Sequence, residues 1–473
     1  MILESAVSRT DPSAELDNLA PIPMECDAPF LTIEGELPRA LNGTLYRNGP
    51  NPQFDVPGAH WFVGDGMLHA FHLENGRASY RNRWVRTPKW RAEHDAGRAI
   101  FAGFGPIRLR DAPPTTCNDS GAANTNIVFH GGRLLALEEG HLPTGIEPGT
   151  LETLGYCDYD RRISGPFTAH PKIDPVTGEM IFFGYNARGP FSSALSFGVI
   201  DAAGRTSRFE HFETPYASMV HDFIVTANHV LFPILPLTGS MERAMRGRPA
   251  YAWEPDRGGY VGVMARNGAT SDIRWFRADA CYVFHVLNAW DDGDRIIADV
   301  LQYDEPPLFP HPDGRKTDPA KSRARLCRWT FDLAANTDRF TQTYLDDIAG
   351  EFPRIDDRRA GLATQHGWYA CANPELADSS AFHGITHVDG SGRRKGQYLL
   401  PKGDSISEPV FVERGVDAPE GDGWLLAVVW RARENRSDLA VFNAQDIAAG
   451  PVALVKLGHR VPDGFHGNWV PAT

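Results

Sequence analysis

Short β-rich runs separated by glycine or aspartate turns recur along almost the whole chain, and this recurrence constrains the fold most. Examples of the runs are "TNIVFHGGRLLALEEG", "FGVIDAAGRTSRFEHF" and "GITHVDGSGRRKGQYLL". The turns contain dipeptides typical of β-hairpins, namely Asn75-Gly76, Gly131-Gly132, Asp389-Gly390 and Asp422-Gly423. Because long helices do not alternate with these strands, the pattern predicts antiparallel sheets rather than β-α-β units.

Strands along 473 residues need an architecture that hides their edges, and radial repetition in a β-propeller does so. A large β-sandwich is the alternative, and the runs are too dissimilar to count repeats. We predict an N-terminal extension over residues 1–30 and a single propeller domain over residues 31–473. Loops and short helices, such as one over residues 239–247, are predicted to cap one face.

Charge and hydrophobic patterning exclude several classes of protein. The net charge of −13 without a basic cluster argues against a nucleic-acid partner. The apolar runs "WLLAVVW" and "VLFPILPL" are shorter than the about 18 residues that cross a bilayer. Charged residues near the start argue against a signal peptide, and six dispersed cysteines fit reduced thiols. We therefore expect a soluble cytoplasmic protein, with peripheral membrane contact left open.

Four histidines share one local setting, at the start or end of a strand beside a turn: His170, His221, His285 and His466. Each one alone is better explained as a core residue. A propeller, however, brings the inner ends of distant blades to one axis, where four rings can converge on one ion. Four imidazoles suit iron(II) and leave two of six octahedral positions open for oxygen and substrate. A zinc hydrolase, which usually keeps three protein ligands and a water, fits less well.

Three glutamates lie in apolar, strand-like segments: Glu139, Glu351 and Glu408. An unpaired carboxylate is costly in such a setting. Metal-bound imidazoles commonly donate their other ring N–H to a carboxylate, so these glutamates are candidate partners of the histidines. For Glu351, a solvent-facing charge beside a turn is an equally good explanation.

The histidine segments, together with "GTLYRNGPNPQF", "HWFVGDGMLHAF", "ANTN" and "EGDGWLLAVV", closely resemble the carotenoid cleavage oxygenase family from about Leu31 to Val470. The resemblance implies a seven-bladed propeller whose axial iron(II) is held by the four histidines, with the three glutamates behind them. Thr125 matches a threonine whose methyl group crowds one open iron position. The implied reaction is O2-dependent cleavage of a conjugated C=C bond into two carbonyl products, with no catalytic acid or base.

The substrate is less well determined by the sequence. The segment after His221 is most similar to bacterial members that cleave isoeugenol or lignostilbene and hold the phenol with a tyrosine and a lysine. These two positions fall on Phe104 and Glu138, so we expect no cation there. The main prediction is therefore an apocarotenoid. The alternative is an aryl alkene such as isoeugenol, 4-vinylguaiacol or lignostilbene, cleaved to an aromatic aldehyde such as vanillin. Phe62 and Phe284 are also predicted to line the pocket.

Two other classes of protein stay open at this point. A metal-dependent propeller hydrolase would bind calcium through carboxylate and amide oxygens rather than imidazoles. A non-catalytic propeller would use its surface as an interaction platform and would bury the histidines for structural reasons. Metal content distinguishes the three possibilities.

Overall fold

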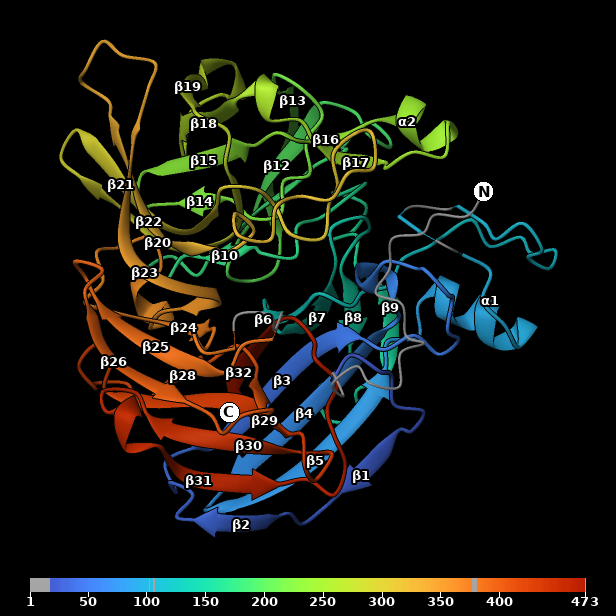
Figure 1. Ribbon diagram of the computed structural model, residues 1–473, viewed down its shortest axis with the longest axis vertical. Helices are drawn as coiled ribbons and strands as arrows, with labels where there is room; N and C mark the ends of the chain where they lie inside the picture. Colours follow the sequence, from blue (N-terminus) through green and yellow to red (C-terminus); the bar gives the residue numbers. More distant parts are fainter. Residues whose placement is uncertain (1–17, 102, 105–106, 377–380, 473) are drawn as a thin grey trace.

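The computed structural model describes residues 18–101, 103–104, 107–376 and 381–472, and its regular structure is mostly antiparallel sheet (Figure 1). The strands form seven blades, which confirms the expected all-β propeller. Blade 1 contains, in spatial order, β1 (Cys26–Ala28), β5 (Arg77–Trp84), β4 (Gly66–Glu74), β3 (Gly43–Pro50) and β32 (Gly467–Pro471). Blade 2 contains β6 (Asn126–His130), β7 (Arg133–Leu137), β8 (Thr144–Ile146) and β9 (Thr153–Tyr156). Blade 3 contains β10 (Lys172–Ile173), β11 (Met180–Gly184), β12 (Ala194–Ile200) and β13 (Thr206–Glu213).

Blades 5 and 6 share one long strand, β23 (Thr341–Arg354), which joins them into a continuous sheet. Its first part pairs with β22 and its last residues pair with β24. The sheet also contains β20 (Tyr282–Asp292), β21 (Arg295–Tyr303), β22 (Arg325–Asp332), β24 (His366–Cys371), β25 (Gly384–Asp389) and β26 (Arg394–Leu399). Blade 4, which precedes it, contains β14 (Ile224–Val225), β15 (His229–Ile234), β18 (Gly259–Ala265) and β19 (Arg274–Ala278).

Both ends of the described chain close the ring. The strand β32 pairs with β3 in blade 1, and β2 pairs with β31 in blade 7. Figure 1 shows the red C-terminal strands beside the blue N-terminal ones. Blade 7 consists of β2 (Thr32–Gly35), β31 (Pro451–Lys456), β30 (Arg436–Asn443), β29 (Gly423–Arg431), β27 (Ser405–Ile406) and β28 (Val410–Glu413). Because β1 also pairs with β5 in blade 1, sheet pairing begins before residue 31, and the predicted N-terminal extension stays a prediction.

The apolar run "WLLAVVW" shows why the blades pack as they do. It forms most of β29, and every one of its residues is buried. Alternate side chains of a strand point to opposite faces. Accordingly, Trp424, Leu426 and Val428 belong to one hydrophobic cluster, whereas Leu425, Ala427 and Val429 belong to another. A blade that is covered on both faces therefore needs a continuous apolar run rather than an alternating one.

Helices contribute little, and they lie outside the blades (Figure 1). The helix α2 (Met241–Met245) falls within the predicted segment 239–247, next to a two-stranded ribbon of β16 (Leu237–Gly239) and β17 (Tyr251–Trp253). The helix α1 (Pro88–Ala96) was not predicted. The remaining helical turns are η1 (Trp61–Val63), η2 (Pro255–Arg257), η3 (Thr270–Asp272), η4 (Asp357–Arg359) and η5 (Ile447–Ala449). Within the described part of the chain, the helices are too short or too polar to span a membrane.

Candidate metal centre and adjoining cavity

The four predicted histidines lie at corresponding places in four blades. His170 and His221 come shortly before β10 and β14, and His466 directly precedes β32. His285 lies within β20, where the pairing with β21 is irregular between Val283 and Val286. Segments that are far apart in the sequence therefore bring four imidazoles together.

The Nε2 atoms of the four buried rings are close enough to bind one ion. They are 3.0 Å apart between His170 and His221, 3.2 Å between His221 and His285, and 3.1 Å between His285 and His466. The candidate ligand atoms of all four residues lie within 4.8 Å of one another. Two nitrogens bound about 2.1 Å from one ion at right angles would be about 3 Å apart. The spacing therefore fits a shared metal ion.

Three of the four rings contact a glutamate through Nδ1. His221 contacts Glu139 and His285 contacts Glu351, and the Nδ1 of His466 lies 2.9 Å from an oxygen of Glu408. An Nδ1–H that donates to a carboxylate leaves the lone pair of Nε2 free to bind a metal. The contacts thus select the tautomer that a metal site requires.

The glutamates have further partners of their own. Glu408 accepts a hydrogen bond from the Gly467 N–H at 2.9 Å and lies 3.5 Å from the guanidinium of Arg354. Burial alone would raise the pKa of Glu408, but Arg354, His466 and the Gly467 N–H outweigh burial and lower this pKa to about 2. Glu139 accepts a hydrogen bond from the Tyr185 hydroxyl at 2.6 Å.

The groups around the rings also fit a metal cation. Burial and the neighbouring rings hold the pKa of His170 well below its ordinary value, so this ring is neutral. The carboxylates of Glu139, Glu351 and Glu408 contact the other three rings. Carboxylates behind the ligands favour a bound cation, and imidazole ligands favour the first-row transition metals.

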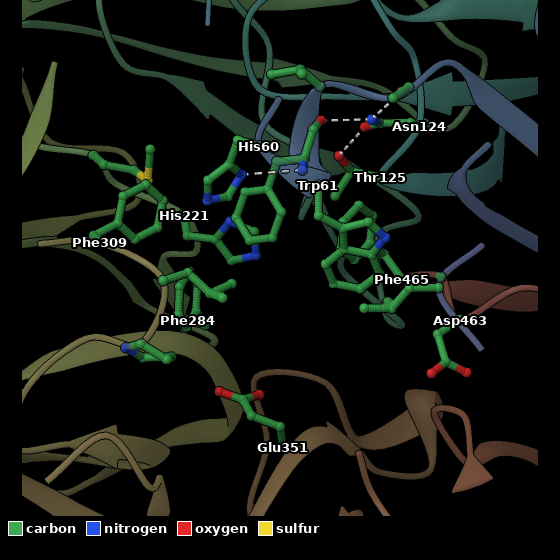
Figure 2. A pocket seen from close by; sticks show the side chains of 18 of the residues that line it. His60, Trp61, Asn124, Thr125, His221, Phe284, Phe309, Glu351, Asp463 and Phe465 are labelled. Atoms are coloured by element: carbon green, nitrogen blue, oxygen red, sulfur yellow. Dashed lines mark hydrogen bonds between the residues drawn. The ribbon is translucent and has the colours of Figure 1, made fainter. Parts of the chain in front are cut away.

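Thr125 lies beside His466, where its main-chain carbonyl accepts the His466 N–H at 3.1 Å. Its hydroxyl donates to the side-chain oxygen of Asn124 at 3.0 Å (Figure 2). The amide of Asn124 in turn donates to the carbonyls of Phe62 and Gly64, each at 2.7 Å. This network fixes the side chain of Thr125 with its hydroxyl turned towards Asn124.

The predicted aromatic residues line one large cavity of about 3570 Å³, which reaches the metal centre. Phe284 presents its edge to His221 at a ring-centre distance of 5.1 Å, and Phe62 lies 6.4 Å from Phe284. Phe104 lies 5.1 Å from His60, which in turn is 4.7 Å from Phe62 (Figure 2 labels His60, His221 and Phe284). The cavity wall beside the histidines is therefore largely aromatic.

Glu138 also lines this cavity, but as one half of an ion pair. Its carboxylate lies 2.5 Å from Nδ1 of His141 and accepts the Ala122 N–H at 3.2 Å. Burial would lower the pKa of His141, but Glu138 and then Asp119 outweigh burial and raise it to about 9. At neutral pH this imidazole is charged. The expectation that Glu138 itself supplies no cation stays a prediction, and the structure adds His141, three positions further along the chain, as its charged partner.

Several residues at the site were not predicted: His60, Asn124, His141, Tyr185, Phe309, Phe352 and Arg354. Phe352 directly follows the predicted Glu351 in "EFPRID", and Arg354 lies three positions after Glu351. His60 and Asn124 lie within quoted motifs. Proximity to a motif could have indicated these four. The sequence around Tyr185 contains no such signal.

The fold and the cluster of four imidazoles define a β-propeller with a metal site on its axis. In comparisons with known proteins, residues 19–471 match the family described as retinal pigment epithelial membrane protein, RPE65. Isoeugenol monooxygenase from Pseudomonas putida is 40% identical over 471 residues, which cover 98% of each chain. Carotenoid cleavage oxygenase 1 from Neurospora crassa is 34% identical and covers 96% of this chain and 89% of its own.

A solved structure is also similar over nearly its whole length. The crystal structure of lignostilbene dioxygenase from Pseudomonas brassicacearum gives a TM-score of 0.92 at 35% identity, over 97% of this chain and 98% of that one. The protein belongs to the RPE65/carotenoid cleavage oxygenase family, as the sequence motifs indicated. It is an oxidoreductase of the dioxygenase type.

Proposed function

We propose that the protein is a non-haem iron(II) oxygenase that uses O2 to cleave the conjugated C=C bond of an aryl alkene into two carbonyl products. One product would be an aromatic aldehyde. The observation that carries this proposal is the convergence of four imidazole Nε2 atoms at the end of an aromatic cavity. His170, His221, His285 and His466 would be the iron ligands. A bound iron(II) ion would supply the electrons that make O2 reactive towards an electron-rich alkene.

The protein's own groups would position the ligands and the substrate. Glu139, Glu351 and Glu408 would hold three of the imidazoles in fixed orientations. We also propose that the methyl group of Thr125 limits access to one open metal position. No side chain is nominated as a catalytic acid or base.

The cavity walls would hold the alkene close to the metal and keep bulk water away. Phe284, Phe62 and Phe104 form an apolar surface that begins beside His221. An aryl ring stacks or packs edge-on against such side chains at ring-centre distances of about 4.5–7 Å. The wall therefore suits a flat aromatic substrate.

We propose an aryl alkene as the substrate in place of the apocarotenoid that the sequence favoured. The relative named for isoeugenol shares more identity with this chain than the relative named for carotenoid cleavage does, at 40% against 34%. Glu138 itself supplies no cation, but His141 is paired with it and lines the same cavity. A phenolic substrate would therefore meet a charged imidazole as well as a carboxylate there.

O2 and a hydrophobic conjugated alkene are the proposed partners. A cytoplasmic location and peripheral membrane contact remain predictions. A calcium-dependent hydrolase receives no support from the cluster on the axis, because the four groups that converge there are imidazoles rather than oxygen ligands.

The proposal is tested by incubating the iron-loaded protein with isoeugenol, 4-hydroxystilbene or an apocarotenal, with and without O2, and measuring the products by chromatography. We expect aldehydes from the two aryl alkenes in air and no aldehyde without oxygen. Conversion of the apocarotenal alone would refute the proposed substrate class. Iron binding without conversion of any of the three would refute the reaction, and failure to bind iron would refute the metal centre.

A further inference from the structure

The last residues of β23 depart from regular strand geometry where this strand reaches the metal centre. Its pairing with β24 is irregular between Glu351 and Arg354. In a regular strand, neighbouring side chains point to opposite faces, so Glu351 and Phe352 would lie on opposite sides. A bulge inserts an extra residue and redirects the side chains around it. Bulges of this kind are common beside active sites.

Phe352 carries the conformational cost of this bulge. Its φ angle is +56°, in the left-handed region that bulky residues rarely adopt. Pro353 follows directly, and a residue before proline normally prefers an extended conformation. Such a backbone persists only where the surrounding structure enforces it, and residues of this kind cluster at functional sites.

The strained backbone places the ring of Phe352 against two of the candidate ligands. Its centre lies 5.3 Å from that of His285 with an angle of 30° between the planes, and 5.2 Å from that of His466. Phe382 packs edge-on against the ring of Phe352 at 5.7 Å. The flat ring therefore lies between Phe382 and the two imidazoles.

The same bulge also places polar side chains beside His285 and His466. Glu351 contacts Nδ1 of His285 and accepts the Phe352 N–H at 2.9 Å. Arg354 lies 3.5 Å from Glu408, the carboxylate that holds His466. Three of the four residues from Glu351 to Arg354 thus contact the surroundings of the metal centre.

We propose that Phe352 is a positioning residue of the metal centre, whose ring fixes the planes of His285 and His466. This inference rests on the proposed metal site. The contact of each Nδ1 with a carboxylate leaves the imidazole free to tilt about that bond, and a flat aromatic face removes this freedom. The bulge is then the feature that makes the contact possible, since a regular strand would turn the ring away.

Three substitutions separate the ring from the backbone strain. Phe352→Leu keeps the strain and most of the apolar volume but loses the flat ring, Phe352→Gly relieves the strain and loses the ring, and Phe352→Tyr keeps the ring. The readouts are cobalt(II) affinity by competitive titration, the visible absorption spectrum of the cobalt-loaded protein, and the melting temperature of the metal-free protein. We expect 10- to 100-fold weaker binding and an altered spectrum for Leu and Gly, as for other residues that orient metal ligands. Tyr should behave like the unchanged protein.

Tyr159 offers a matched control, because it is a buried aromatic residue with a φ of +49° that packs against Arg133. Tyr159→Leu and Tyr159→Gly should leave cobalt affinity and the spectrum unchanged. Normal affinity and a normal spectrum in Phe352→Leu and Phe352→Gly would overturn the proposal. If the unchanged protein does not bind cobalt, the metal centre itself is refuted, and the inference fails with it.

Discussion

Replacing Glu138 by Gln should destabilise the protein in a manner that depends on pH, because it removes the partner of a charged His141. The pKa of His141 is about 9 in the folded protein, against an ordinary value of 6.5. Each pKa unit corresponds to about 1.4 kcal/mol, so the full difference corresponds to about 3 kcal/mol. The side chain of His141 is 26% exposed, and solvent screening reduces the expected contribution to about 1–2 kcal/mol.

The sign follows from the direction of the pKa change. Folding raises the pKa of His141, so the stabilisation is fully present below pH 6.5 and is lost as the pH rises through about 9. Glu138→Gln should therefore lower the free energy of unfolding most near pH 6 and very little near pH 10. The hydrogen bond from the Ala122 N–H is retained, because the amide oxygen of Gln can accept it.

Equilibrium denaturation between pH 6 and 10, in one buffer series at constant ionic strength, measures this difference. The matched control is a double-mutant cycle with His141→Asn, in which Glu138→Gln should have almost no further effect at any pH. A loss of stability that does not change with pH, or that survives in the His141→Asn background, would show that the two residues do not form a charged pair. A substrate would then find no cation beside Glu138, which is what the sequence alone predicted.

Three further predictions concern the metal centre. His285→Ala should abolish stoichiometric metal binding, because it removes one of four converging nitrogens, and metal analysis of the purified protein checks this. Tyr185→Phe removes the hydroxyl that donates to Glu139 and should weaken metal binding about tenfold, as measured by competition with a chelator. Arg354→Met leaves the buried carboxylate of Glu408 without its cation and should lower the free energy of unfolding by about 3 kcal/mol, as measured with denaturant.

Each of these three substitutions has a matched control substitution away from the metal centre. His130→Ala removes a buried histidine that bonds to the Gly178 carbonyl and should leave metal content unchanged. Tyr216→Phe removes a hydroxyl that donates to main-chain carbonyls and should leave metal affinity unchanged. Arg295→Met breaks an exposed ion pair and should cost at most about 1 kcal/mol. Equal effects in a variant and its counterpart would contradict the corresponding prediction.

The predictable part of the site consists of residues whose position in a strand is visible in the sequence. The four histidines and three glutamates lie in or beside strands within apolar segments, and a propeller brings the inner ends of its strands together. Phe352 was not predictable in this way, because the alternation of side chains places it on the wrong face unless the bulge is known. The number of blades could not be counted from the sequence either, because the runs are too dissimilar to be recognised as repeats, and the structure adds that one strand, β23, serves two blades.

The helix α1 could have been predicted from the sequence. The helix α1 has Thr87 as its N-cap, Pro88 at its start and Gly97 in a left-handed conformation at its end, and all three are recognised sequence signals. The pair of Glu138 and His141 is a different case. Its pKa effect depends on burial and on the approach of the two side chains, which a spacing of three residues in a loop does not determine.

Pairing of Thr44 with Val470 joins two segments near opposite ends of the described chain, and His466 lies just before this junction. Metal binding and closure of the propeller are therefore expected to be thermodynamically coupled. An ion that binds all four imidazoles would oppose opening of the junction, and a closed junction brings His466 to the other three ligands before the ion binds. During synthesis, the cluster of four imidazoles stays incomplete until His466 has been added, so a shorter chain lacks one of the four candidate ligands.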